Sequence, residues 1–157
     1  MRDGHVTRAR LAYGLACDIE HEDRSMRADL PAREGGSATG PNPGQLMRAS
    51  LCASLLMGYR IWAGRLGVAL DAARVEITCE FDAPPDQAER AAASATPVWS
   101  RFRFDVTLVG PAPELELLRV AEAAHRHSAM LALLSDTVER EFRIQVRPPV
   151  APSIRSA

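Results

Sequence analysis

The sequence contains no lysine, only three cysteines, and aromatic residues at only 5% of its 157 positions. All 19 basic residues are arginines, and against 20 acidic residues they leave a net charge of −1. The exclusive use of arginine, together with abundant alanine, indicates GC-rich bacterial codon usage. Because the arginines are scattered, no basic stripe is available to neutralise the phosphates of a nucleic acid or an acidic membrane surface. We therefore expect neither partner.

The three cysteines, Cys17, Cys52 and Cys79, form no C-x-x-C motif and lie near no cluster of metal-ligating residues. Neither a disulfide framework nor a zinc site is predicted, and no cofactor is expected. The first ten residues lack the apolar core of a signal peptide. The longest uncharged run of the central apolar segment, residues 49–59, is too short to span a bilayer. The sequence therefore predicts a cytoplasmic protein with reduced thiols.

A long helix is predicted behind the Pro- and Gly-rich loop of residues 31–44. Asn42 can accept a hydrogen bond from the free amides of the first turn, and Pro43 is well suited to the first helical position. Arg65 in the last turn and Gly67 just beyond it mark the other end. Apolar residues occupy nearly every face between these limits, so we expect a central helix that is buried nearly all round. A row of small residues four apart favours close packing against another backbone: Ser50, Ser54 and Gly58.

The rest of the chain predicts strands and one further helix. The second helix covers 113–128, with an apolar side made of Leu117, Val120, Ala121 and Ala124. Alternating segments predict strands, and no linker or repeat divides the chain. We therefore expect one α+β domain over residues 1–157. The predicted strands lie at 10–20, 23–30, 70–83, 98–110 (pairing with 70–83 as a hairpin around the loop 84–97) and within 135–149.

This order of elements, with the segment "GGSATGPNPGQLMRASLCASLLMGYRIWAGRLGVAL", resembles the OsmC/Ohr family of osmotically inducible protein C and organic hydroperoxide resistance proteins. The resemblance implies an intertwined homodimer with two long helices buried at its centre and two active sites at the subunit interface. Family members reduce organic hydroperoxides with two cysteines. One thiolate on the central helix attacks the O–O bond and becomes a sulfenic acid, which the second thiol resolves to a disulfide. An arginine and a glutamate activate the first thiol.

When the chain is matched to the family pattern without gaps, neither cysteine position of the family falls on a cysteine of this chain. The position of the first family cysteine falls on Ser54, whereas Cys52 lies two residues earlier and points elsewhere, since two helical residues turn a side chain by roughly 200°. The family glutamate falls on Gln45, which carries no charge. The second family cysteine falls on Ser128, or on His127 if the register slips by one. The activating arginine has two candidates, Arg8 and Arg10.

Three functions follow from this match as hypotheses. The preferred one is a protein that has lost the peroxide chemistry and binds a small hydrophobic molecule at the subunit interface or acts as a scaffold. The alternative is a thiol-dependent peroxidase of the oxidative stress response that uses Cys52. The third is an enzyme that uses Ser54 with His125 or His127 as its base, but no G-x-S-x-G elbow or acidic partner accompanies it. Otherwise Cys52 is expected to be a buried, inert thiol and the two histidines to be surface residues.

Overall fold

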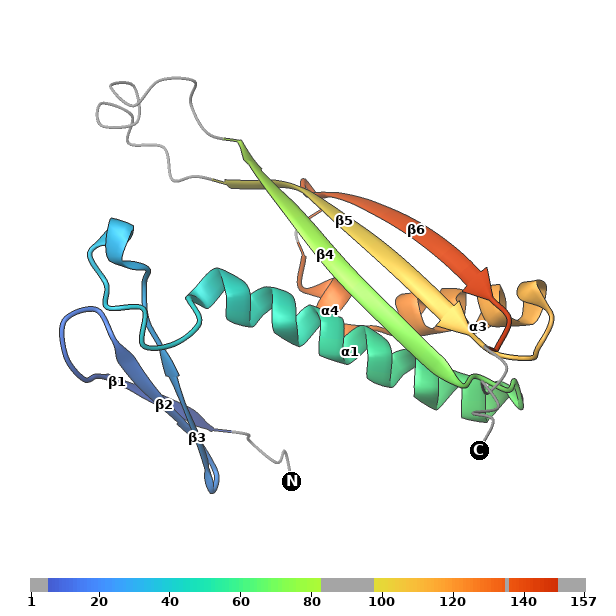
Figure 1. Ribbon diagram of the computed structural model, residues 1–157, viewed down its shortest axis with the longest axis horizontal. Helices are drawn as coiled ribbons and strands as arrows, with labels where there is room; N and C mark the ends of the chain where they lie inside the picture. Colours follow the sequence, from blue (N-terminus) through green and yellow to red (C-terminus); the bar gives the residue numbers. More distant parts are fainter. Residues whose placement is uncertain (1–5, 83–97, 135, 150–157) are drawn as a thin grey trace, which may run out of the picture. The chain divides into compact units, whose positions relative to one another are not determined.

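The computed structural model describes residues 6–82, 98–134 and 136–149. They belong to two compact units, Met1–Ser50 and Leu51–Ala157, and Figure 1 traces the chain through both. The predicted loop 84–97 lies outside the described residues. No helix of the described part of the chain is long and apolar enough to cross a membrane.

The first unit is built on a three-stranded antiparallel sheet. Its strands pair in chain order: β1 (Thr7–Leu11), β2 (Cys17–His21) and β3 (Arg24–Ala28). The prediction of one continuous strand over 10–20 was wrong, because the chain turns at Gly14, where φ is +58° and the Ala16 amide donates to the Tyr13 carbonyl at 3.0 Å. Glycine adopts this left-handed conformation without the steric cost of a Cβ. A short 3₁₀ helix, Ala32–Glu34, follows in the loop after β3.

The long helix α1 (Pro43–Leu66) has the predicted bounds, and Gly67 follows it with φ +67°. Its buried side chains recur every four residues and form one stripe: Leu51, Leu55, Tyr59 and Ala63. Met57 and Ile61, on another side of the helix, are 60% and 51% exposed. Within a single chain, therefore, α1 is buried along one side and not all round.

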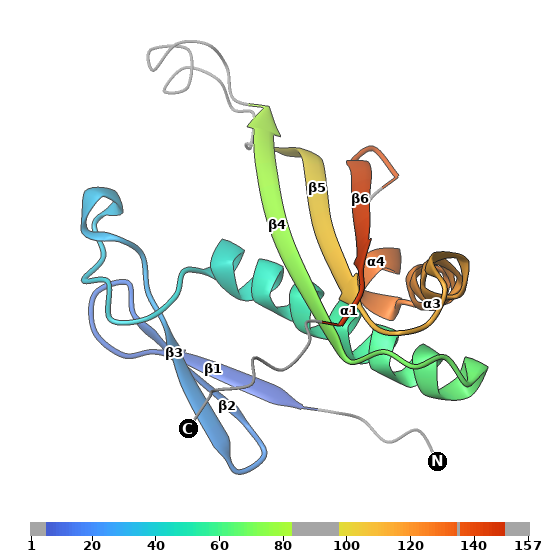
Figure 2. The same cartoon turned by 45° about the vertical axis from the view of Figure 1, so that its right-hand side comes forward.

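The second unit holds a three-stranded sheet of order β4-β5-β6. The predicted hairpin is confirmed, since β4 (Ala72–Asp82) and β5 (Val98–Val109) pair antiparallel. β6 (Glu139–Arg147) lies parallel to β5, an arrangement that needs a crossover connection. Alternate residues of β5 are fully buried and therefore lie on one face of the sheet, whose strands β4, β5 and β6 can be followed side by side in Figure 2. These buried residues are Phe102, Phe104, Val106 and Leu108.

The crossover between β5 and β6 contains α3 (Glu114–Arg126), the predicted second helix. All four residues of its predicted apolar side are buried. α1 and α3 approach closely, because a Cβ added at Gly58 would lie 3.4 Å from the Ala124 Cβ. Gly58 of the predicted small-residue row thus packs inside the chain. The sequence analysis did not predict the four-residue helix α4 (Ala129–Ala132), which is separated from the end of α3 by His127 and Ser128.

Candidate functional site

Cys52 and Ser54 lie in the middle of α1 and point in different directions. The Cys52 thiol is half-buried and lies 3.9 Å from the Val75 carbonyl oxygen of β4, to which it donates a weak hydrogen bond. Ser54 is also half-buried, and no hydrogen bond joins its hydroxyl to another group of the described residues. Because a two-residue step turns a side chain by roughly 200°, the thiol faces β4 while the hydroxyl faces another side of the helix.

Gln45 takes part in the start of α1. The Asn42 amide donates to Gln45 Oε1 at 2.8 Å, and the Gln45 amide donates to Asn42 Oδ1 at 2.9 Å. This reciprocal pair satisfies two backbone amides that a helix start leaves without partners, and it confirms Asn42 as the N-cap. The side-chain oxygen of Gln45 is therefore already used in the fold of the first unit.

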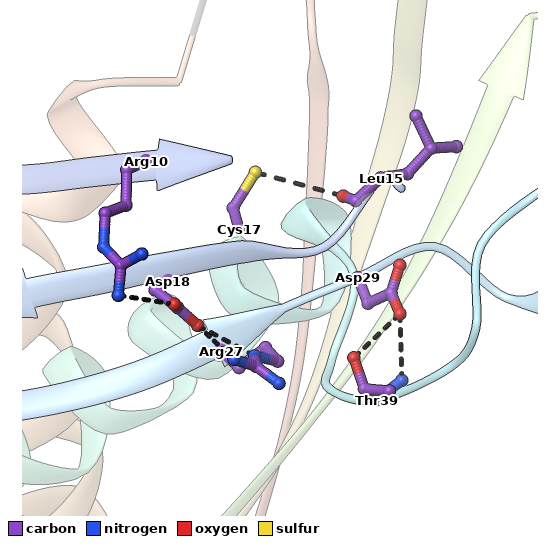
Figure 3. A network of polar contacts seen from close by, with 7 residues as sticks. All are labelled: Arg10, Leu15, Cys17, Asp18, Arg27, Asp29 and Thr39. Carbon is purple, nitrogen blue, oxygen red and sulfur yellow. Dashed lines mark hydrogen bonds and ion pairs between the residues drawn. The ribbon is translucent and has the colours of Figure 1, made fainter. Parts of the chain in front are cut away.

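The two candidate arginines lie on β1 of the first unit, and one of them is paired. Arg10 contacts the Asp18 carboxylate at 3.0 Å, and Arg27 of β3 contacts the same carboxylate at 2.6 Å (Figure 3). Arg8 is exposed and lies opposite Glu20 in the sheet register. Asp18 therefore takes part in two ion pairs, and its single negative charge is shared between Arg10 and Arg27.

A buried carboxylate organises the loop that leads into α1. Asp29 is 2% exposed and accepts hydrogen bonds from the Thr39 amide at 3.1 Å and the Thr39 hydroxyl at 2.8 Å (Figure 3). The amides of Ser37 and Leu30 donate to it as well. These bonds, that from the Thr39 amide first, hold the pKa of Asp29 below its usual value against the opposing effect of burial. The geometry makes Asp29 a structural anchor of the glycine-rich loop.

Ser128 and His127, the two candidates for the second family cysteine, lie at the junction between α3 and α4. Ser128 caps α4, its hydroxyl oxygen accepting from the Leu131 amide at 3.2 Å. His127 is exposed, as expected of a surface histidine, and stacks on Trp62 of α1 with ring centroids 4.7 Å apart. Arg65 lies over the same indole at 4.9 Å.

The polar pair that the sequence reading missed joins Tyr59 of α1 to His125 of α3. Tyr59 is fully buried, and its hydroxyl lies 2.7 Å from His125 Nε2. The imidazole packs against Phe142 of β6, with ring centroids 4.1 Å apart. Burial lowers the pKa of His125 to about 4 and raises the pKa of Tyr59 above its usual range, so both groups are neutral at pH 7.

The expectation that His125 is a surface histidine was therefore wrong. His125 follows Ala124, the last buried residue of α3, and is therefore close in sequence to the side of the helix that packs against the rest of the fold. A tyrosine in the buried stripe of α1 also needs a hydrogen-bond partner, because its hydroxyl is out of reach of water. These were the two signals that could have pointed to the pair.

His125 also lines a cavity of ≈ 410 Å³ at the junction of α3, α4 and β6. Ser128 and Arg140 contribute polar groups, while Leu131 and Phe142 contribute apolar surface. No three His, Cys, Asp or Glu side chains of the described ranges come together in a way that could hold a metal ion. The polar groups of this cavity are suited to hydrogen bonding rather than to metal ligation.

The chain matches the family model described as OsmC-like protein over residues 35–143. No curated protein matches the chain. The matched residues include most of the glycine-rich loop, the helices α1 and α3, and the start of β6.

Several solved structures share the fold. An OsmC-like protein from Mycoplasma pneumoniae aligns with a TM-score of 0.77 at 12% identity, covering 93% of this chain and 99% of its own. An organic hydroperoxide resistance protein OsmC from Legionella pneumophila gives 0.68 at 16% identity, with coverage of 91% and 97%. The organic hydroperoxide resistance protein OhrB of Bacillus subtilis gives 0.62 at 16% identity, with coverage of 90% and 98%. At these identities the likeness is one of fold.

Proposed function

The chain belongs to the OsmC-like protein family, and we propose that it retains the architecture of that family without its cysteine chemistry. In this proposal the protein is a cytoplasmic homodimer that binds a small hydrophobic molecule between its subunits or acts as a scaffold. The match over residues 35–143 crosses the boundary between the two compact units, which supports one OsmC-like domain.

The observation that carries the proposal is the direction of the Cys52 thiol. A peroxidatic thiolate needs a neighbouring cation and access to the peroxide. The Cys52 thiol lies on the side of α1 that faces β4 and approaches the Val75 carbonyl at 3.9 Å, whereas the family position, two residues later, is turned to another side of the helix. The position that carries the thiol in the family holds Ser54 here, and a serine hydroxyl cannot be oxidised to a sulfenic acid by a hydroperoxide.

The supporting residues of the family site are also committed elsewhere. Gln45, at the family's glutamate position, is uncharged and caps α1. Arg10 is paired with Asp18. The glutamate that helps to activate the family thiol therefore has an uncharged counterpart here, and Arg10 shares one carboxylate with Arg27.

The position of the second family cysteine has two candidates in this chain, Ser128 and His127. Ser128 caps α4 through its hydroxyl oxygen, and His127 stacks on Trp62 of α1. Neither side chain carries a thiol, so neither can convert a sulfenic acid to a disulfide.

A serine enzyme based on Ser54 and His125 is not supported by the hydrogen bonds. A general base must offer an unprotonated nitrogen to the nucleophile. The Nε2 atom of His125 lies 2.7 Å from the Tyr59 hydroxyl, and because a buried hydroxyl has to donate its hydrogen to an acceptor, Tyr59 donates and Nε2 accepts. The other ring nitrogen then carries the proton, so no acceptor remains for the Ser54 hydroxyl.

The homodimer is supported by the outward side of α1. Met57 and Ile61 are one turn apart and are 60% and 51% exposed in the single chain. Apolar side chains that are half exposed at this spacing are suited to packing against a helix of a second copy of the chain. We expect light scattering to give twice the chain mass of 17.1 kDa. Ile61→Glu is expected to shift the protein toward monomer, while Leu115→Glu, at an apolar residue of α3 that is 66% exposed, is expected to leave the mass unchanged.

The loss of peroxide chemistry is tested by direct assay. The purified protein is incubated with cumene hydroperoxide and dithiothreitol, and peroxide loss is followed beside intact mass measurement. We expect peroxide consumption no faster than without protein, no addition of oxygen at Cys52, and no difference between the protein and its Cys52→Ser variant. Turnover that disappears in Cys52→Ser would establish the peroxidase and overturn the proposal.

A further inference from the structure

The cavity at the junction of α3, α4 and β6 is lined by both hydrogen-bonding and apolar side chains. Its volume of ≈ 410 Å³ is within the range of small-molecule sites. Leu131, Ala132 and Phe142 supply the apolar surface, and His125, Ser128 and Arg140 supply the nearest polar groups. All of these residues belong to the second unit of one chain.

The hydrogen bond to Tyr59 determines the proton position on His125. The Tyr59 hydroxyl is fully buried, and its partner among the described residues is His125 Nε2. A buried hydroxyl has to donate its hydrogen to an acceptor, so Tyr59 donates and Nε2 accepts. The neutral imidazole then carries its own hydrogen on Nδ1. No group of the described residues accepts from this Nδ1–H, which is therefore available to a bound molecule.

Ser128 and Arg140 add further donors. The Ser128 oxygen accepts from the Leu131 amide, which leaves the hydroxyl hydrogen for another acceptor. Arg140 donates to the Leu131 carbonyl at 3.4 Å, and its nearest carboxylate, on Asp136, lies 3.9 Å away on a fully exposed side chain. An exposed pair at that distance neutralises little of the guanidinium charge.

We propose that this cavity binds a small organic carboxylate, with the carboxylate on Arg140, Ser128 and the Nδ1–H of His125 and the apolar body against Leu131 and Phe142. The Nδ1–H of His125, the hydroxyl hydrogen of Ser128 and the remaining N–H groups of Arg140 are donors, so together they favour a ligand that only accepts. A single weakly paired arginine matches one negative charge better than the two of a phosphate. Arg126, also at the cavity, is already paired with Glu122.

This inference does not depend on the proposed loss of peroxide chemistry. The cavity is formed within one chain, whereas the proposed hydrophobic ligand lies between two subunits. A protein that consumes cumene hydroperoxide through Cys52 could still bind the carboxylate, and a protein that consumes none could fail to bind it. The two experiments therefore separate the two proposals.

Benzoate and benzamide are a matched pair of probes, because they share shape and ring and differ in charge and in the donor character of the amide. Binding to the full-length protein is measured by NMR titration of backbone amides. We expect benzoate to shift the amides of residues 125–132 and to bind at least roughly tenfold more tightly than benzamide, the factor that about 1.4 kcal/mol gives. Equal affinity for the two probes would overturn the proposal.

The variant Arg140→Gln has a matched control on the same strand. Arg143→Gln removes an arginine from the opposite face of β6, where it pairs with Glu141. We expect Arg140→Gln to weaken benzoate binding roughly tenfold with little effect on benzamide, and Arg143→Gln to change neither. Equal effects of the two variants on benzoate would show that the guanidinium acts only through net charge and would refute the site.

The tautomer of His125 is read independently from long-range ¹H–¹⁵N spectra of the imidazole rings, with the signal assigned by its loss in His125→Asn. We expect the Nδ1–H form in the free protein and a shift of the Nδ1 resonance when benzoate is added. An Nε2–H tautomer would remove the donor on which the site depends and so contradict the assignment.

Discussion

The hydrogen bond between Tyr59 and His125 is expected to stabilise the fold. A double-mutant cycle measures its contribution to the free energy of unfolding by comparing Tyr59→Phe, His125→Leu and the double variant. Tyr59→Phe deletes the donor and keeps the ring, and His125→Leu deletes the acceptor and keeps much of the apolar contact. The atoms involved lie 2.7 Å apart and join two helices through residues 66 positions apart in the chain.

Each single variant leaves one polar group without its partner, and the costs differ with burial. Tyr59→Phe leaves Nε2 of a half-buried ring without its donor, which lowers the free energy of unfolding by about 2 kcal/mol. His125→Leu leaves the hydroxyl of a fully buried Tyr59 unpaired, at a cost of about 3 kcal/mol. The double variant removes both polar groups. We therefore expect it to lose less than the two single variants together, by roughly 1–2 kcal/mol.

The pH dependence has a defined sign. Burial lowers the pKa of His125 to about 4 in the folded protein, whereas an unfolded histidine titrates near about 6.5. Between these values the unfolded chain binds a proton that the folded chain does not, so stability falls as pH falls from about 6.5 to about 4. The full shift corresponds to about 3 kcal/mol, which solvent contact of the half-buried ring reduces to about 2 kcal/mol.

The assay is urea unfolding followed by far-UV circular dichroism at one fixed protein concentration, because subunit association makes stability depend on concentration. Unfolding is measured at pH 7.5, 6.0 and 4.5, and the His125→Leu values are subtracted from those of the unmodified protein so that carboxylate titration cancels. Additive single variants, or a pH-independent difference between the two proteins, would refute the pairing of a neutral His125 with Tyr59.

Three further predictions concern the loop before α1 and its cap. Asp29→Asn is expected to lower the melting temperature. The lowered pKa of Asp29 means that its carboxylate stabilises the fold above pH 4, and that this stability is lost as pH falls below that value. Differential scanning fluorimetry should therefore show a smaller difference in melting temperature between the two proteins at pH 3 than at pH 7. Gln45→Ala should cost about 1 kcal/mol in urea unfolding by removing half of the reciprocal cap with Asn42, while Gln45→Glu keeps the acceptor and should cost nothing. Gly36→Ala should destabilise the first unit strongly, because a Cβ there would lie 2.0 Å from the Leu30 carbonyl oxygen, and a melting temperature equal to that of the unmodified protein would contradict this close approach of the two backbone segments.

Elements with local signals were predictable from the sequence. The start of α1 follows from Asn42 and Pro43, and its end follows from Gly67, because caps satisfy or terminate hydrogen bonds within a few residues of themselves. The buried side of α3 follows from helical periodicity, and the pairing of β4 with β5 follows from alternation along both strands. The wrong prediction of one strand over 10–20 also has a local cause. The turn at Gly14 takes only a few residues, and it interrupts an apolar run whose composition is otherwise typical of a strand.

The sequence by itself also determined that Cys52 and Ser54 point in different directions, because the angular step of a helix is constant. It could not determine what each side chain meets. The thiol contact with β4, the proton position on His125 and the donor-lined cavity beside it all depend on how α1, α3 and β6 pack together, and above all on the approach of Gly58 to Ala124. Periodicity identifies the buried face of an element, but the partner of a buried polar group is selected by contacts between elements far apart in the chain, and only the tertiary structure brings those together.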